Sequence, residues 1–551
     1  MAARMKKATF LISVMAAGLS SGCLEKPDST PGTASTILFR YHFLGTTQLA
    51  RTTNNVQLPA ILALPATREF TEEVLQKLSR RPEELWRKFL PAAATTQPAL
   101  VRPLLDDLAS AESFAEVHGP LHRGESVFAI ELNDGRADIW RKNLGEILTG
   151  WKLGNPNPVN LGESKGWEMK NAQAPGLIQF VRAGKWVLIG LGQERLTLLP
   201  GLLEQITKTG RPIVLQSNVP LELEADCPRL GDWLPALSKC KLPPLHLTLT
   251  GRGGYLRSEA RLTFSEPLPL RIDPWKFPTN FVHDPIISFT VARGIAPLLS
   301  QVKGVPALGL NPLPNQVCAW GPATIHTDTR FSVPMANPSN VLYQLGPKLP
   351  DFTTGLLSQP IGGFALVTNR SELFWQGWPV LLPYVQAVRD AGTEYLVGGV
   401  FPMGPRSTNP PPPELFAQLK ERPKLVYYDW EITQERLSHA EQMQQLWDMM
   451  NHLRFPPTNA PGQKWLLAIA PHLGNTTTEA TLTSPTELTF VRKSDLGFTG
   501  IELATLARWV ASAGFPWSFE QPAPTSTHTN APGSKTNPPA TPTLAPGAKK
   551  P

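Results

Sequence analysis

Proline is the residue that most limits what this chain can fold into. The 551 residues include 57 Pro and 42 Gly, and a proline inside a helix removes a hydrogen bond and clashes with the preceding turn. This proportion excludes a coiled coil or a long helical solenoid and favours short elements with irregular connections. Apolar residues make up 41% and charged residues 18%, which is enough to bury cores. The length corresponds to two to four domains.

The formal net charge of +7 comes mostly from the two ends of the chain. Each end carries three positive residues and no acid: Arg4, Lys6 and Lys7 at the start, and Lys535, Lys549 and Lys550 at the finish. The residues between them carry a net charge of only +1. A nearly neutral body has no electrostatic footprint for a polyanion, so nucleic acid is excluded as a partner.

The N-terminus has the pattern of an export signal. A basic segment, Met1–Lys7, precedes the apolar and small residues Ala8–Ser21 and then Gly22-Cys23. This is typical of a secretory signal peptide, and the apolar run is too short to cross a bilayer of about 30 Å. Cysteine directly after small residues resembles the lipobox of bacterial lipoproteins, although Ser20 stands where that family usually has Leu.

The lipoprotein resemblance implies a signal peptide over residues 1–22 and a diacylglycerol on Cys23, which becomes the mature N-terminus. We therefore expect an exported envelope protein, anchored in a membrane and facing the periplasm or the exterior. The alternatives are ordinary cleavage, which yields a secreted protein, and an uncleaved anchor. No later segment has 18 consecutive apolar residues, so we expect no further membrane span.

Two polar segments flank the predicted body. Residues 23–35 read as a tether between the anchor and the body. Residues 521–551 contain 8 Pro and 6 Thr, with Leu544 as the only large apolar side chain. Such a segment buries too little surface to offset its ordering entropy, which predicts a disordered tail.

The body mixes short alternating strands with amphipathic helices, which predicts an α+β fold with antiparallel sheets. Residues 37–43 alternate as in a half-buried strand, and strands over 245–250 and 255–264 flank a glycine-rich turn. Further strands are expected over 126–132, 185–191, 286–291, 364–368 and 424–430, and helices over 71–80, 82–90, 100–109, 434–453 and 500–512.

A repeated block suggests that the body contains two similar units in tandem. The sequence Gln-Glu-Arg-Leu follows a strand at Lys185 and again follows a strand at Lys424. We therefore expect units over 36–275 and 285–515, with the two strands in equivalent places. Prolines between 274 and 285 suit a linker between the units.

Cys227 and Cys240 bracket a short segment, and export would place them in an oxidising compartment. A disulfide between them is one expectation, and two independent buried thiols are the other. A loop of about 15 residues closed in this way would stabilise the fold by about 3 kcal/mol in the chain-entropy model.

Asp429 and Glu431 are the candidate catalytic residues. Alternate residues of a strand share a face about 6–7 Å apart, a spacing at which two carboxylates can act on a glycoside. The flanking Tyr427, Tyr428 and Trp430 could stack on a sugar. The alternative is a strand end with solvated or capping acids.

Other patterns fail on geometry. His283, Asp284 and Ser288 lie on one extended segment, where neighbours face opposite ways and cannot form a triad. Gly-Pro between His118 and His122 prevents the helix that would join both rings on a metal. We expect no metal and no cofactor.

These observations favour a non-enzymatic envelope protein that binds or scaffolds another envelope component. The first alternative is a periplasmic hydrolase of carbohydrate or peptide that uses Asp429 and Glu431. The second is a carrier of an apolar ligand. A deep apolar pocket would favour the carrier, and carboxylates in an open cleft would favour the hydrolase.

Overall fold

The structure is a computed structural model, and it shows a protein of mixed helices and strands. The residues that it describes are 37–52, 55–80, 82, 96–119, 124–171, 176–192, 195–212, 219–230, 242–302, 305–324, 327–348, 363–366, 371–376, 382–401, 409–410, 413–450 and 460–516.

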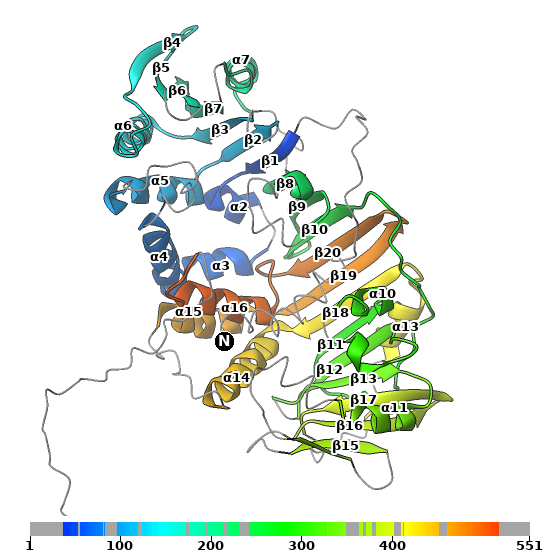
Figure 1. Ribbon diagram of the computed structural model, residues 1–551. Helices are drawn as coiled ribbons and strands as arrows, with labels where there is room; N and C mark the ends of the chain where they lie inside the picture. Colours follow the sequence, from blue (N-terminus) through cyan, green and yellow to red (C-terminus); the bar gives the residue numbers. More distant parts are fainter. Residues whose placement is uncertain are drawn as a thin grey trace, which may run out of the picture.

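The strands form a single antiparallel sheet of 20 strands, which runs as a continuous curved band in Figure 1. Its first ten strands, in spatial order, are β4 (Asn157–Leu161), β5 (Ser164–Asn171), β6 (Gly176–Ala183), β7 (Trp186–Gly192), β3 (Glu125–Glu131), β2 (Ser113–His118), β1 (Ile37–Phe43), β8 (Leu221–Ala225), β9 (Leu245–Arg252) and β10 (Tyr255–Thr263). The next ten are β20 (Glu487–Ser494), β19 (Asn475–Ser484), β18 (Leu425–Ile432), β11 (Ile286–Arg293), β12 (Gln316–Pro322), β13 (Arg330–Pro334), β17 (Thr393–Gly399), β16 (Tyr384–Asp390), β15 (Glu372–Gln376) and β14 (Gly363–Leu366). The predicted mixture of helices with antiparallel strands is confirmed.

The order of strands in the first half of the sheet recurs in the second half. From its outer edge to the middle of the sheet, the first half runs β4-β5-β6-β7-β3-β2-β1-β8-β9-β10. From the opposite outer edge to the middle, the second half runs β14-β15-β16-β17-β13-β12-β11-β18-β19-β20, which is the same order with ten added to each number. The halves meet where β10 pairs with β20, and Glu259, the fifth residue of β10, pairs with Val491, the fifth residue of β20. Antiparallel pairing of corresponding strands relates the two halves as a local twofold axis would.

The predicted hairpin over 245–264 is present as β9 and β10. Arg252 pairs with Tyr255, which leaves a two-residue turn of Gly253 and Gly254. Both glycines have positive φ, 62° and 86°, and a type I′ turn requires this at both central positions. Glycine adopts this backbone conformation without strain, so the turn sets the register of both strands.

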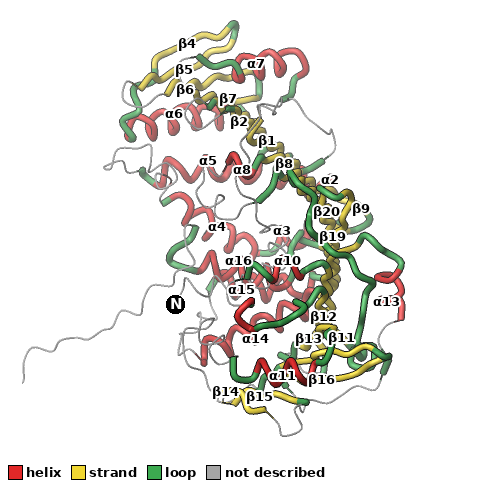
Figure 2. The backbone as a smooth tube through the Cα atoms, turned by 45° about the vertical axis from the view of Figure 1, so that its right-hand side comes forward, coloured by secondary structure: helices red, strands yellow, loops and turns green. Residues whose placement is uncertain are grey.

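Helices cover both faces of the sheet. They are α2 (Thr46–Thr52), α3 (Gln57–Ala63), α4 (Pro65–Ser79), α5 (Pro98–Ser110), α6 (Asp134–Gly150), α7 (Leu198–Thr209), α8 (Cys227–Leu230), α10 (Ala296–Leu299), α11 (Pro338–Leu345), α13 (Pro413–Lys420), α14 (Thr433–Met450), α15 (Pro461–Ile469) and α16 (Gly500–Ala511). Figure 2 shows α4, α5, α6, α14, α15 and α16 on one side of the sheet and α13 on the other. We call the first side the helical face.

Connections of unequal length distinguish the two halves. Between its first two strands the first half has 69 residues, 44–112, which contain α2 to α5, whereas the second half has only 22, 294–315. Conversely, residues 433–474, which include α14 and α15, have a shorter counterpart at 226–244. The two long insertions pack together, and the rings of Phe70 in α4 and Trp465 in α15 stack at 4.4 Å. The helical layer therefore joins the halves a second time.

The proline-containing segment at 274–284 is the connection between β10 and β11, and part of it is buried. Trp275, Phe277 and Val282 pack into the core that also contains Phe289 and Trp320. The guanidinium of Arg293 lies 4.3 Å from the centre of the Trp275 ring, within cation–π range. This connection therefore packs as part of the second half.

The expected equivalence of the strands at Lys185 and Lys424 is wrong. The first, β7, lies between β6 and β3, whereas the second, β18, lies between β11 and β19. By strand order the counterpart of β18 is β8, and that of β7 is β17. The helix after β18 belongs to an insertion that the first half does not share, so the Gln-Glu-Arg-Leu match is coincidental.

Candidate functional site

Asp429 and Glu431 share one face of β18, as their spacing predicts. This is the helical face, so helices cover both side chains. Asp429 is 9% exposed and Glu431 is 2% exposed. The N-terminus of α16 lies over Glu431, because the Gly500 N–H donates to Glu431 Oε1 at 2.7 Å. Helix α14 begins directly after β18 and packs on the same strand. Figure 1 shows both helices beside this strand.

Asp429 is held by groups from neighbouring strands. Thr290 and Thr478 are its cross-strand partners on β11 and β19. The hydroxyl of Thr290 donates to Asp429 Oδ1 at 2.5 Å. Arg492 on β20 donates through Nε to the hydroxyl of Thr478 at 2.9 Å, and its terminal nitrogens donate to Glu502 of α16. A continuous polar row therefore leads from Asp429 across the sheet to α16.

Glu431 connects the sheet to the first turn of α16, and the residue opposite it on β11 is bound by α14. Gly500 is the first residue of α16, and an N–H at this position is free to donate outside the helix. The partial positive charge of a helix N-terminus also favours a carboxylate there. Arg436 of α14 donates to Ser288, the cross-strand partner of Glu431, at 3.1 Å.

Burial changes the acidity of both carboxyl groups. Burial and, second to it, the nearby charge of Asp429 raise the pKa of Glu431 from its ordinary value of 4.5 to about 8, against the hydrogen bond from Gly500. Burial also raises the pKa of Asp429, and the hydrogen bond from Thr290 opposes the rise. Two like charges in one buried site disfavour double ionisation.

This geometry suits a structural role better than acid–base catalysis. A general acid or base must reach a proton of the substrate, and the two carboxyls of a glycosidase flank the scissile bond. Asp429 and Glu431 instead lie side by side on one strand and accept hydrogen bonds from the chain itself. Asp429 binds a neighbouring strand, and Glu431 fastens α16 to the sheet.

On β8, the counterpart of β18 by strand order, no such acid pair lies on the helical face. Directly paired residues on neighbouring strands share a face of the sheet. Starting from Asp429 on β18, the successive partners on β19, β20, β10, β9 and β8 are Thr478, Arg492, Ser258, Leu249 and Leu221. Leu223 and Ala225 lie on that same face, so the acids of β8, Glu222 and Glu224, lie on the opposite one. The acid pair of β18 therefore has no counterpart on the same face of β8.

The structure does not bring the other candidate residues together at the acid pair. Cys23 and Cys240 lie outside the described residues, so lipidation and the disulfide stay predictions; Cys227 is buried in α8. His118 is on β2 and pairs with Glu116 at 2.6 Å, and His122 lies outside the described residues. The ring Nδ1 of His283 is 2.8 Å from the carbonyl oxygen of Asn409, whereas Ser288 contacts Arg436.

Sequence patterns did not indicate the polar residues that α14 and the segment just before β13 bring to this region. His439 of α14 is buried, and its Nε2 lies 3.3 Å from the Thr329 hydroxyl. Asp328 is completely buried and accepts a hydrogen bond from Arg330 Nε at 2.8 Å. None of these residues stands in a motif, because pairs such as Thr329 and His439 meet only through tertiary contacts.

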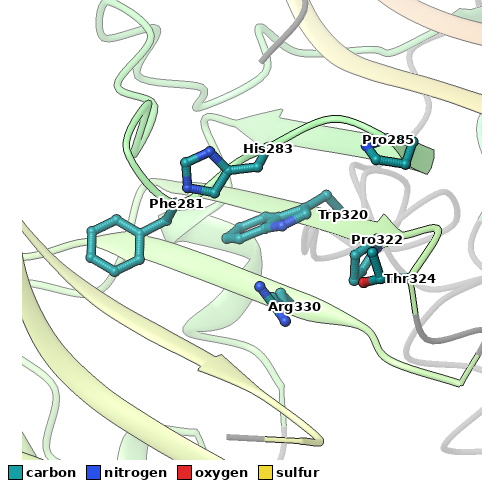
Figure 3. Close-up of a pocket in the computed structure, with 7 residues that line it drawn as sticks. All are labelled: Phe281, His283, Pro285, Trp320, Pro322, Thr324 and Arg330. Atoms are coloured by element: carbon teal, nitrogen blue, oxygen red, sulfur yellow. The ribbon is translucent and has the colours of Figure 1, made fainter. Parts of the chain in front are cut away.

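A small hollow opens on the other face of the sheet, at the ends of β12 and β13 (Figure 3). It has a volume of about 240 Å³, including the part open to solvent. It is lined by Phe281, His283, Pro285, Trp320, Pro322, Thr324 and Arg330. A second, more open hollow beside α11 is lined mainly by polar residues, among them Asn337, Arg389 and Glu394.

No three His, Cys, Asp or Glu side chains in the described residues are arranged to hold a metal ion. No helix in the same residues is both long and apolar enough to cross a membrane.

Comparisons with protein-family models, with curated proteins and with solved structures give no match to this chain.

Proposed function

We propose that this chain is an exported bacterial envelope protein, anchored by a lipid on Cys23, that binds another component without catalysing a reaction. The basic, apolar and small-residue pattern over residues 1–23 supports export and anchoring. The observation that carries the non-enzymatic part is the cover over Asp429 and Glu431. Both carboxyls are buried below α14 and α16 and accept hydrogen bonds from the chain's own donors.

The architecture of the proposed protein is that of two related units, 36–275 and 285–515. The recurring strand order and the pairing of β10 with β20 support this. We infer that an ancestral unit was duplicated and that each copy then acquired its own helical insertion.

Neither alternative has comparable support. A hydrolase would need the acid pair in an open cleft, and α14 and α16 lie over it instead. A carrier would need an enclosed apolar cavity. The two hollows described above are open, and one is lined mainly by polar side chains.

The anchor is tested by Cys23→Ala. Each buried acyl CH₂ contributes about 0.8 kcal/mol to membrane binding, so loss of the diacylglycerol should move the mature protein from the membrane fraction to the soluble fraction. Fractionation of cells with immunoblotting measures this. Metabolic labelling with an alkyne fatty acid should mark the wild type and leave Cys23→Ala unlabelled.

Ser20→Leu is the matched control, because it supplies the residue that the lipoprotein family usually has at that position. We expect it to be labelled and retained in the membrane at least as well as the wild type. Unchanged membrane retention of Cys23→Ala would refute the lipid anchor.

A further inference from the structure

The face of the sheet opposite the helical face carries exposed polar side chains over the four central strands, β9, β10, β20 and β19 (Figure 2). We call it the outer face. Alternate residues of a strand point to opposite faces, so the neighbours of the helical-face residues Thr478, Arg492 and Ser258 lie on it. Pairing arranges twelve of them, each at least partly exposed, in three rows: Thr250-Arg257-Lys493-Thr477, Thr248-Glu259-Val491-Glu479 and His246-Arg261-Thr489-Thr481.

The first of these rows places two cations directly opposite each other. Arg257 of β10 pairs with Lys493 of β20, and like charges in directly opposed positions destabilise a sheet. Arg257 lies 3.3 Å from a carboxylate oxygen of Glu259, but Arg261 binds the same carboxylate at 2.9 Å. Among the residues that the structure describes, the ammonium group of Lys493 has no hydrogen bond or ion pair. Binding sites are where proteins keep such unfavourable pairs.

The outer face has more positive than negative charge around this pair. The charge of Lys493 lowers the pKa of Glu479, but hydrogen bonds from Arg422 lower it more, and two nitrogens of Arg422 already bind that carboxylate. Counted over the three rows with Arg422, four positive side chains face two carboxylates. The next acid on β20, Glu487, lies six residues before Lys493. The surplus favours an anionic partner over the first row.

The first row ends beside an aromatic ring. Thr477 pairs with Trp430 of β18, which packs against the core of the second half and is half-buried. Asp429 lies on the helical face, so Trp430 lies on the outer face. From Thr250 to Trp430 the row crosses five strands, a length of about 19 Å at the usual strand spacing. An indole ring can stack on the C–H face of a sugar, and threonine hydroxyls both donate to and accept from sugar hydroxyls.

A sparsely charged glycan matches this row better than nucleic acid or protein. Duplex DNA carries one charge about every 1.7 Å, and Glu259 and Glu479 in the next row would repel so dense a polyanion. The centre of a protein interface is apolar, whereas this row has one aromatic side chain at its end. We propose that the row from Thr250 to Trp430 binds a linear glycan that carries widely spaced carboxylates. This inference rests on the proposed binding function and names the chemistry of the partner.

The test is calorimetric titration of the full mature chain, kept soluble by Cys23→Ala. The probes are hexagalacturonate, its fully methyl-esterified form, and a short DNA duplex. We expect the acid to bind about tenfold more tightly than the ester, because the ester lacks the charges that face Arg257 and Lys493. Equal binding of acid and ester would overturn the proposal. Tighter binding of the duplex than of the acid would also overturn it, in favour of a nucleic-acid surface.

Lys493→Gln tests the pair of cations. It should weaken binding of the acid about fivefold and leave binding of the ester unchanged. The denaturation midpoint should not fall, because the substitution removes the like charge opposite Arg257. Lys142→Gln is the matched control, since Lys142 is also exposed but lies on α6, on the helical side of the sheet. It should leave the affinity for both probes unchanged. Unchanged binding of the acid by Lys493→Gln would overturn the proposal.

Trp430→Leu tests the aromatic end of the row. Loss of the ring should weaken binding of acid and ester by the same factor, because stacking does not depend on the carboxylates. Thr477→Val decides the matter if Trp430→Leu does not fold, and it should weaken both probes about threefold by loss of one neutral hydrogen bond. Absence of glycan binding would overturn this inference while leaving the wider binding function intact. Cleavage of the glycan during the titration would instead contradict the non-enzymatic proposal.

Discussion

At the residue scale, the informative feature is the pair of buried carboxyls on β18. Each is bound to a different part of the structure, Asp429 to the sheet through Thr290 and Glu431 to α16 through Gly500. Their raised pKa values are the expected result of burying two acids together. The burial of this pair makes the stability of the fold depend on pH.

Glu431→Gln should make the protein more stable at neutral pH. An acid that titrates at about 8 when folded and at 4.5 when unfolded binds more protons in the folded state between these values. Stability therefore falls as pH rises through that window, by at most about 1.4 kcal/mol per pH unit. Glutamine cannot ionise, and its carbonyl can still accept from Gly500. Chemical denaturation of both proteins from pH 5 to 8 should show a gain for the variant that grows with pH.

Glu479→Gln on the neighbouring strand β19 is the control with the opposite sign. Hydrogen bonds from Arg422 lower the pKa of Glu479, so this group stabilises the fold above its ordinary pKa and loses that contribution as pH falls. Its replacement should destabilise the protein at neutral pH and have little effect in acid. A loss of stability in Glu431→Gln that grows with pH would show that Glu431 acts as a charged partner.

The sequence predicts only part of this site. The alternation on β18 predicts that Asp429 and Glu431 share a face, and the structure agrees. What covers them cannot be read from local pattern, because Gly500 lies 69 residues along the chain from Glu431. The hollow with Arg330 was not predicted either, since Trp320 and Arg330 become neighbours only when β12 and β13 pair.

At the element scale, the helical insertions join the two halves of the sheet. Trp465 of α15 is buried and stacks on Phe70 of α4, and the side chain of Asn55 donates to the carbonyl of Asp495 at 2.9 Å. Local patterns predicted most elements well, including the hairpin of β9 and β10. The helix predicted over 71–80 begins earlier, at Pro65, because proline is favoured in a first turn.

Trp465→Ala should remove the main contact between the insertions. Replacing a buried tryptophan by alanine costs about 3–5 kcal/mol, and here the loss should separate the unfolding of the two halves into two transitions. Leu467→Ala is the control on the same helix, since Leu467 is 62% exposed and should change stability by less than about 0.5 kcal/mol. Scanning calorimetry distinguishes the cases. A single unshifted transition in Trp465→Ala would contradict the joining role of the insertions.

At the scale of the whole molecule, the β10–β20 pair joins two halves that share a strand order but differ in surface. The acid pair of β18 lies on the helical face, whereas the acids of β8 lie on the other. A four-residue sequence match cannot reveal such a relation, because it is expressed in pairing order and not in residue identity.

Val491→Glu tests the junction directly. The new carboxylate would lie opposite Glu259, and like charges in directly opposed strand positions are destabilising, here by roughly 1 kcal/mol. Thr489→Glu is the matched control on the same strand, because its partner is Arg261, and it should be neutral or slightly stabilising. Denaturant midpoints at low ionic strength measure both. Equal effects of the two substitutions would indicate that this register does not hold in solution.

The β10–β20 pair also affects the order in which the chain can finish folding during synthesis. The partner of β10 is one of the last segments to emerge, so an incomplete chain presents β10 as an open edge to other copies. Two such edges that adopted the native register would place Glu259 opposite Glu259, since this residue holds the central position of the pair. Charge repulsion would oppose that encounter, whereas the native partner offers Val491. We expect this repulsion to disfavour pairing between unfinished chains before their own last strand has been synthesised.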